Sequence, residues 1–106
     1  MKLFLAAVAL TASFALPGHG EIIIGSGAAS SCGRWLDDRQ HDRHWQMANW
    51  ALGFISGAAI WGDSVGDPLA STDSDGVFYW LDNYCKTHPS VYFHKAAEEF
   101  VRTHRG

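Results

Sequence analysis

The segment HDRHWQMANWALGFISGAAIW, residues 41–61, carries the strongest structural signal in the chain. Its apolar residues recur every three or four positions, which is the period of an α-helix. They form two stripes, one of Trp45, Ala48, Leu52, Ile55 and Ala59 and the other of Met47, Trp50, Phe54, Ala58 and Trp61. Together the stripes cover most of the circumference, so we expect a central helix that is buried nearly all round.

Small residues interrupt this helix at Gly53, Ser56 and Gly57. Each glycine costs about 1 kcal/mol relative to alanine inside a helix, so we expect a neighbouring helix to cross closely over them. A catalytic serine would need the order Gly-x-Ser-x-Gly on a turn between a strand and a helix. Ser56 instead precedes Gly57 directly, and we interpret it as a packing residue bonded to a carbonyl one turn back.

Two further segments complete the first part of the fold. Residues 32–40 (CGRWLDDRQ) form a short amphipathic pattern, and the serines at positions 30–31 are good N-caps for it. Residues 62–76 are rich in glycine, proline, serine and aspartate, which predicts a long connection made of turns. Asp73 or Ser74 can cap the helix that follows.

That third helix is expected over residues 75–86. The residue before a proline resists the helical conformation, and proline favours the first helical position. The last helix is therefore expected to start at Pro89, with Thr87 or His88 as its cap. The pattern as a whole predicts an all-α, four-helix bundle-like domain.

The chain begins with MKLFLAAVALTASFA, in which Lys2 precedes an apolar run that ends at small residues. This is the pattern of a secretory signal peptide over residues 1–15, cleaved after Ala15 or as late as Gly20. The polar residues after position 10 make the run too short for a membrane span. We expect residues 16–31 to form an extended arm and residues 32–106 to form the helical domain, exported and no longer membrane-bound after cleavage.

The chain has two cysteines, Cys32 and Cys85. In an exported protein two cysteines favour a disulfide, and closing a loop of this length contributes roughly 4 kcal/mol in the chain-entropy model. The alternatives for Cys85 are a reactive thiol, with Asp82 and His88 nearby in sequence, or a metal ligand. Both need a partner group that the sequence does not offer.

Other polar groups give weaker signals. His41 and His44 are three apart and could share a metal ion on a helix, but DDRQHDRH is also typical of a solvated helix end. The aspartates of the long connection lack the ligand register of a calcium loop. Glu98 and Glu99 do not define an acid and base pair. We therefore predict no catalytic residues, no metal and no cofactor.

The formal net charge is −3, and no lysine or arginine cluster is present. Binding to nucleic acid or to an anionic membrane is therefore disfavoured.

The order of Cys32-Gly-x-Trp35, Gly53-x-x-Ser56-Gly57 and Asp82-Asn-Tyr-Cys85, with Pro89 four residues on, resembles the Rap/Tai family over about residues 30–103. The characterised members are periplasmic immunity proteins that block a cell-wall amidase delivered by type VI secretion, often as dimers. The resemblance implies a four-helix-like fold, a disulfide matching Cys32 and Cys85, a protein partner and a homodimer.

A more distant similarity is to HdeA, an acid-stress chaperone of comparable size that also has two cysteines. The sequence therefore leaves two hypotheses, a non-enzymatic periplasmic binding protein and a pH-responsive chaperone, with a small hydrolase as a third. Contacts with a partner are expected in the long connection, where the candidate residues are Asp63, Asp67, Asp73 and Asp75.

Overall fold

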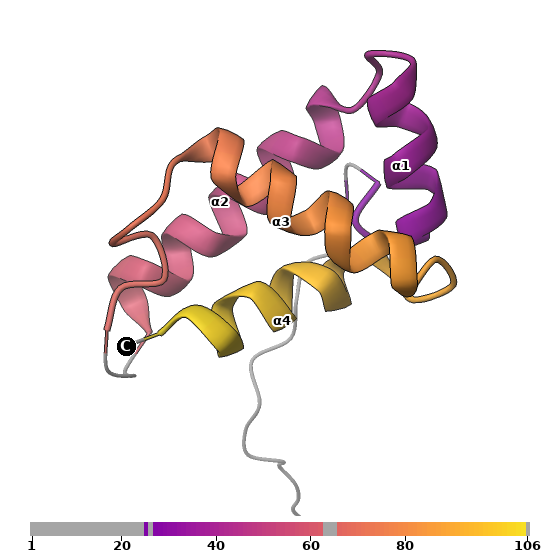
Figure 1. Cartoon of the computed structure of the whole chain (residues 1–106). Helices are drawn as coiled ribbons and strands as arrows, with labels where there is room; N and C mark the ends of the chain where they lie inside the picture. The colour runs from indigo at the N-terminus through magenta and orange to yellow at the C-terminus, as the bar shows by residue number, and fades with distance from the viewer. Residues whose placement is uncertain (1–24, 26, 63–65, 106) are drawn as a thin grey trace, which may run out of the picture.

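The computed structural model describes residues 25, 27–62 and 66–105 (Figure 1). It contains four helices, α1 (Cys32–Gln40), α2 (Trp45–Trp61), α3 (Ser74–Thr87) and α4 (Phe93–His104). Outside these helices, Ser31 and Tyr92 form an isolated antiparallel bridge. The predicted all-α class with four helices is confirmed.

Local signals decide where α1, α2 and α3 begin or end. The Ser31 hydroxyl accepts a hydrogen bond of 3.1 Å from the Arg34 backbone N–H and caps α1. The Asp73 carboxylate accepts one of 2.9 Å from Gly76 and caps α3. Gly62 follows the last residue of α2. The two capping side chains satisfy backbone donors that a helix leaves free at its first turn.

The expected start of α4 is wrong. Pro89 lies in a turn, and the helix begins four residues later, at Phe93. No side chain caps it. Instead the carbonyls of Ser30 and Ala28 accept hydrogen bonds from the backbone N–H groups of Phe93 (2.7 Å) and His94 (3.0 Å). The N-terminal arm caps α4, and a cap from a distant segment cannot be read from local sequence.

The first turn of α1, which follows the arm, is hydrogen-bonded to the segment before α4. Cys32 and Gly33 donate backbone hydrogen bonds of 2.8 and 2.9 Å to the carbonyls of Val91 and Pro89. Ala28 is fully buried. The last residues of the predicted arm therefore belong to the packed fold. The predicted signal peptide and residues 16–24 lie outside the described residues.

The core lies where α1 packs on α3, α2 on α4 and α3 on α4 (Figure 1). Trp35 stands at its centre, stacked on Phe93 with ring centroids 4.8 Å apart and edge-on to Phe78 at 5.9 Å. The buried cluster comprises Cys32, Trp35, Met47, Ala48, Ala51, Ile55, Val77, Phe78, Leu81, Cys85, Phe93, Ala96 and Phe100.

The prediction that α2 is buried nearly all round is wrong. Its buried residues, Met47, Ala48, Ala51 and Ile55, lie on one side. Ile60 and Trp61 are 69% and 85% exposed. The physical reason is size, because three other helices of 9 to 14 residues cannot surround a helix of 17.

The expected close helix crossing over the glycines is also absent. A Cβ atom added at Gly53 or at Gly57 would have nothing within 4 Å outside its own helix segment.

No helix of the described residues is long and apolar enough to cross a membrane.

Candidate functional site

The two cysteines are joined. Cys32 at the first turn of α1 and Cys85 in the last turn of α3 form a disulfide, with Cα atoms 4.9 Å apart and a sequence separation of 53 residues. Both residues are fully buried. The predicted disulfide is confirmed, and it excludes a free thiol at Cys85 as a nucleophile or a metal ligand.

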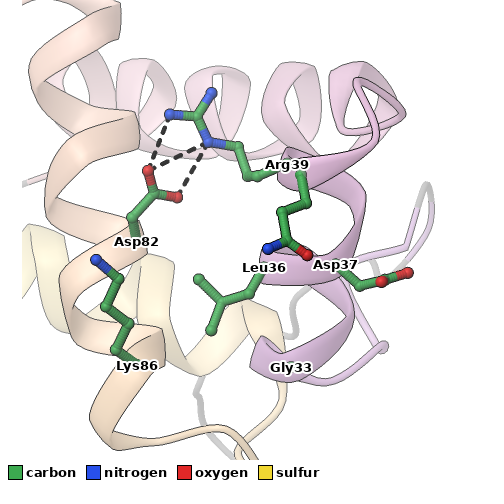
Figure 2. A pocket seen from close by; sticks show the side chains of 7 residues that line it. Gly33, Leu36, Asp37, Arg39, Asp82 and Lys86 are labelled. Carbon is green, nitrogen blue, oxygen red and sulfur yellow. Dashed lines mark hydrogen bonds and ion pairs between the residues drawn. The ribbon is translucent and has the colours of Figure 1, made fainter.

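A second link between α1 and α3 is polar. The Arg39 guanidinium donates hydrogen bonds to both carboxylate oxygens of Asp82, from Nε at 3.0 Å and from Nη2 at 2.9 Å (Figure 2). The Trp35 indole N–H donates to the same carboxylate at 2.8 Å. The guanidinium carbon also lies 5.5 Å from the centre of the Phe78 ring. The hydrogen bond from Arg39 to Asp82 raises the pKa of Arg39, as a pairing that favours the charged form does.

An open cleft of about 720 Å³ lies beside this ion pair, between α1 and α3 (Figure 2). Asp82 and Lys86 come from α3, and the remaining lining residues are Gly33, Leu36, Asp37, Arg39 and Gln40 of α1.

The charged groups of the cleft are mostly occupied. Arg39 and Asp82 bind each other, and the Asp37 carboxylate accepts a hydrogen bond of 3.0 Å from Arg43. Within the described part of the chain, Lys86 is the one charged lining residue without an ion pair. The ion pair of Arg39 and Asp82, with the disulfide beside it, joins α1 to α3. We therefore interpret this side of the cleft as the open face of a structural link.

The predicted solvated helix end at residues 37–44 is partly wrong. Asp38 and His44 are buried, with exposures of 5% and 4%. Arg34 donates to the Asp38 carboxylate at 3.1 Å. Asp42 adopts a positive φ of 56°, and the chain turns there from α1 into α2.

His44 is the N-cap residue of α2 but makes no side-chain cap hydrogen bond. Its Nε2 lies 3.4 Å from Nη1 of Arg39, which can only donate, so the tautomer with its proton on Nδ1 is the one that fits this contact. Nδ1 is buried and has no hydrogen-bond partner. Leaving a donor unsatisfied in this way costs about 1–3 kcal/mol.

The histidine pair considered from sequence does not come together. The exposed His41 places Nδ1 2.8 Å from the Asp37 carbonyl oxygen, whereas His44 faces Arg39 inside the fold. Over residues 25, 27–62 and 66–105, no three His, Cys, Asp or Glu side chains are grouped as metal ligands. Glu98 and Glu99 each have a partner, His94 at 2.8 Å and Arg102.

The candidate aspartates of the long connection do not converge. Asp67 and Asp73 accept backbone hydrogen bonds of 2.9 Å from Leu69 and Gly76, so both stabilise local turns. Asp75 is exposed in the first turn of α3. Asp63 lies outside the described residues.

A surface that sequence reasoning missed is the solvent side of α2. It comprises Asn49, Gly53, Gly57, Ile60 and Trp61, and we name it the α2 outer face. The helix has no charged residue along its 17 positions. An exposed apolar surface of this kind marks an interaction site more often than an isolated exposed leucine does. The absence of charged residues can be seen in the sequence. However, it is typical both of a helix buried in its own fold and of a helix that binds a partner, so the sequence does not distinguish the two.

Comparison of the chain with protein-family models, with curated proteins and with solved structures finds no match. The resemblances to Rap/Tai and to HdeA therefore stay predictions.

Proposed function

We propose that this protein acts outside the cytoplasm by binding another protein, without catalysing a reaction. The observation that carries the proposal is the α2 outer face, where Ile60 and Trp61 are 69% and 85% exposed at the end of an uncharged helix. Tryptophan is enriched among the residues that dominate binding energy at interfaces.

The disulfide supports the proposed compartment. Structural disulfides persist in oxidising compartments and are rare in the cytosol. Together with the signal-peptide pattern of residues 1–15, this favours export to the periplasm.

The resemblance to Rap/Tai proteins names the first partner to test, a peptidoglycan amidase delivered by type VI secretion. The mature, oxidised protein and its Trp61→Ser variant should be compared as baits in periplasmic extract, and each captured protein then titrated in purified form. We expect a single protein to bind the wild type at least about 30-fold more tightly than the variant, which is the effect of losing an interface residue worth about 2 kcal/mol.

The control is Tyr92→Ser, which alters another exposed aromatic residue, at the start of α4. Equal binding to both variants and to the wild type would remove the α2 outer face from the proposal. Inhibition of a captured amidase would support the immunity role, whereas a captured protein of another class would leave binding in place and remove that role.

A second candidate function, an acid-activated chaperone, is favoured by one observation. The buried His44 places Nε2 3.4 Å from Nη1 of Arg39, where a second positive charge would be unfavourable. This candidate function requires the contact between α1 and the start of α2 to open in acid. Dye binding and suppression of aggregation should rise at about pH 3 relative to pH 7, and a His44→Gln variant should reduce the difference. Identical behaviour at the two pH values would remove this candidate.

A further inference from the structure

The cleft between α1 and α3 contains polar groups that the link between these helices does not use. Arg39 and Asp82 bind each other, and the Asp82 carboxylate also accepts the hydrogen bond from Trp35. Lys86, one helical turn further along α3, lines the cleft and has no ion pair among the described residues. The side-chain amide of Gln40 also lines it, without a hydrogen-bond partner in the part of the chain that the structure describes.

The walls of this cleft are fixed by two links. The disulfide joins Cys32, at the start of α1, to Cys85. The ion pair joins Arg39, near the other end of α1, to Asp82. Because both helices are held at two points, the cleft exists before any ligand enters it. A preformed site loses less conformational entropy when it binds.

The cleft also has an apolar wall. Leu36 is partly buried against the core, and its side chain points from α1 towards α3 (Figure 2). Gly33 lies one turn earlier on the same side of α1 and fills none of the space beside the leucine with a side chain. The volume of about 720 Å³ lies within the range of roughly 300–1,000 Å³ that is typical of small-molecule sites.

The charges of the lining favour a ligand with one negative charge. Arg39 and Asp82 neutralise each other, and Asp37 is bound by Arg43. Lys86 is therefore the uncompensated charge, and its ammonium group attracts an anion. A cation would find no free carboxylate here. The carboxylates of Asp37 and Asp82 would oppose the second negative charge of a phosphate monoester.

From this geometry we infer that the cleft binds a small organic monocarboxylate with an apolar body. Lys86 pairs with the carboxylate, Leu36 contacts the apolar body, and the Gln40 amide supplies a further hydrogen bond to the ligand. The site is separate from the α2 outer face, so it does not depend on the proposed protein-binding function. A free small acid and the C terminus of a peptide share this chemistry.

NMR titration of the full mature protein in its oxidised form tests the inference. The probes are octanoate, phenylacetate and acetate, the primary amides of the first two, phenyl phosphate, and a hydrophobic tripeptide with a free or an amidated C terminus. We expect octanoate or phenylacetate to shift the backbone amide signals of Gly33, Leu36, Gln40 and Lys86. Each should bind about tenfold more tightly than its amide, and acetate, which lacks an apolar body, about tenfold more weakly than octanoate.

Variants at Lys86 separate its charge from the general charge of the protein. Lys86→Gln should weaken binding of the carboxylates about tenfold, whereas Lys86→Arg should retain it. The matched control is Lys95→Gln, which removes an equal charge from an exposed position on α4 and should leave binding unchanged.

The tripeptide distinguishes the two sources of the carboxylate. Tighter binding of the free tripeptide than of the small acids, lost on amidation, would support the site and assign it to a peptide C terminus. Tighter binding of the small acids would support it and assign it to a free acid.

Three results would overturn the inference. The first is equal binding of a carboxylate and its amide, or tighter binding of phenyl phosphate. The second is unchanged binding in Lys86→Gln. The third is the absence of shifts at the cleft residues with every carboxylate at millimolar concentration. None of these results would affect the proposed function, which is tested at Trp61.

Discussion

Replacing Asp82 with asparagine removes the charge that links α1 to α3 while keeping the size of the side chain. The amide oxygen of asparagine can still accept the hydrogen bond from the Trp35 indole, which is 2.8 Å in the native structure. It cannot match the two donors of Arg39, which lie 3.0 and 2.9 Å from the carboxylate oxygens. The guanidinium would therefore lose its bidentate partner.

The magnitude follows from the exposure of the pair. A hydrogen bond to a charged group contributes about 1.5–3 kcal/mol. The side chains of Arg39 and Asp82 are 31% and 21% exposed, so water partly compensates for the loss. We expect Asp82→Asn to lower the free energy of unfolding by about 1.5 kcal/mol, or roughly 6–12 °C in Tm for a domain of this size.

Urea unfolding followed by tryptophan fluorescence measures this change. The matched control is Glu99→Gln, because Glu99 is bonded to Arg102 in the same bidentate manner but at an exposed position on α4, where a much smaller effect is expected. A double-mutant cycle with Arg39→Met isolates the pair and should give a coupling of about 1 kcal/mol or more. Equal effects of the two single variants, together with zero coupling, would refute the reasoning.

The disulfide, the glycines and the Glu99–Arg102 pair each give a further prediction. Reducing the disulfide, whose cysteines are separated by 53 residues, should lower the free energy of unfolding by about 4 kcal/mol; an unchanged urea midpoint in reductant would contradict this. Gly53→Ala and Gly57→Ala should each raise the free energy of unfolding by about 0.5–1 kcal/mol, because a Cβ has open space there, and should weaken partner binding. Gly76→Ala should lower it, because the new Cβ would lie 1.9 Å from Oγ1 of Thr72. In calorimetry, a lower Tm of Gly53→Ala or Gly57→Ala would contradict the first expectation, and an unchanged or higher Tm of Gly76→Ala would contradict the second. Arg102→Gln should raise the pKa of Glu99, which the hydrogen bond from Arg102 lowers from 4.5, as measured by carboxyl NMR titration. A carboxyl group whose pKa is lower in the folded state than in the unfolded state stabilises the fold at pH values above its unfolded-state pKa. The free energy of unfolding should therefore rise less in Arg102→Gln than in the wild type as the pH is raised through the pKa of Glu99.

Features with local causes could be predicted from the sequence. The caps at Ser31 and Asp73 and the end of α2 at Gly62 depend on residues within one turn. The pairing of Cys32 with Cys85 was also predictable, because only two cysteines are present.

Features that depend on distant segments could not be predicted. The start of α4 is set by carbonyls of Ala28 and Ser30, more than 60 residues earlier in the chain. The buried indole of Trp35 needed an acceptor, which was a usable signal, but the sequence did not indicate that Asp82 would supply it.

By itself, then, the sequence determined the helices, most of their ends and the disulfide. Helical periodicity and caps depend on residues close together in the chain, and two cysteines allow only one pairing. The tertiary structure decided which side of α2 faces solvent and which carboxylate accepts the hydrogen bonds of Trp35 and Arg39. Removing an apolar side chain from water is favourable whether its own fold or another protein buries it. The hydrophobic pattern of a sequence therefore does not show which of the two will do so. On the α2 outer face the domain has too few helices to do so, and Trp61 stays exposed.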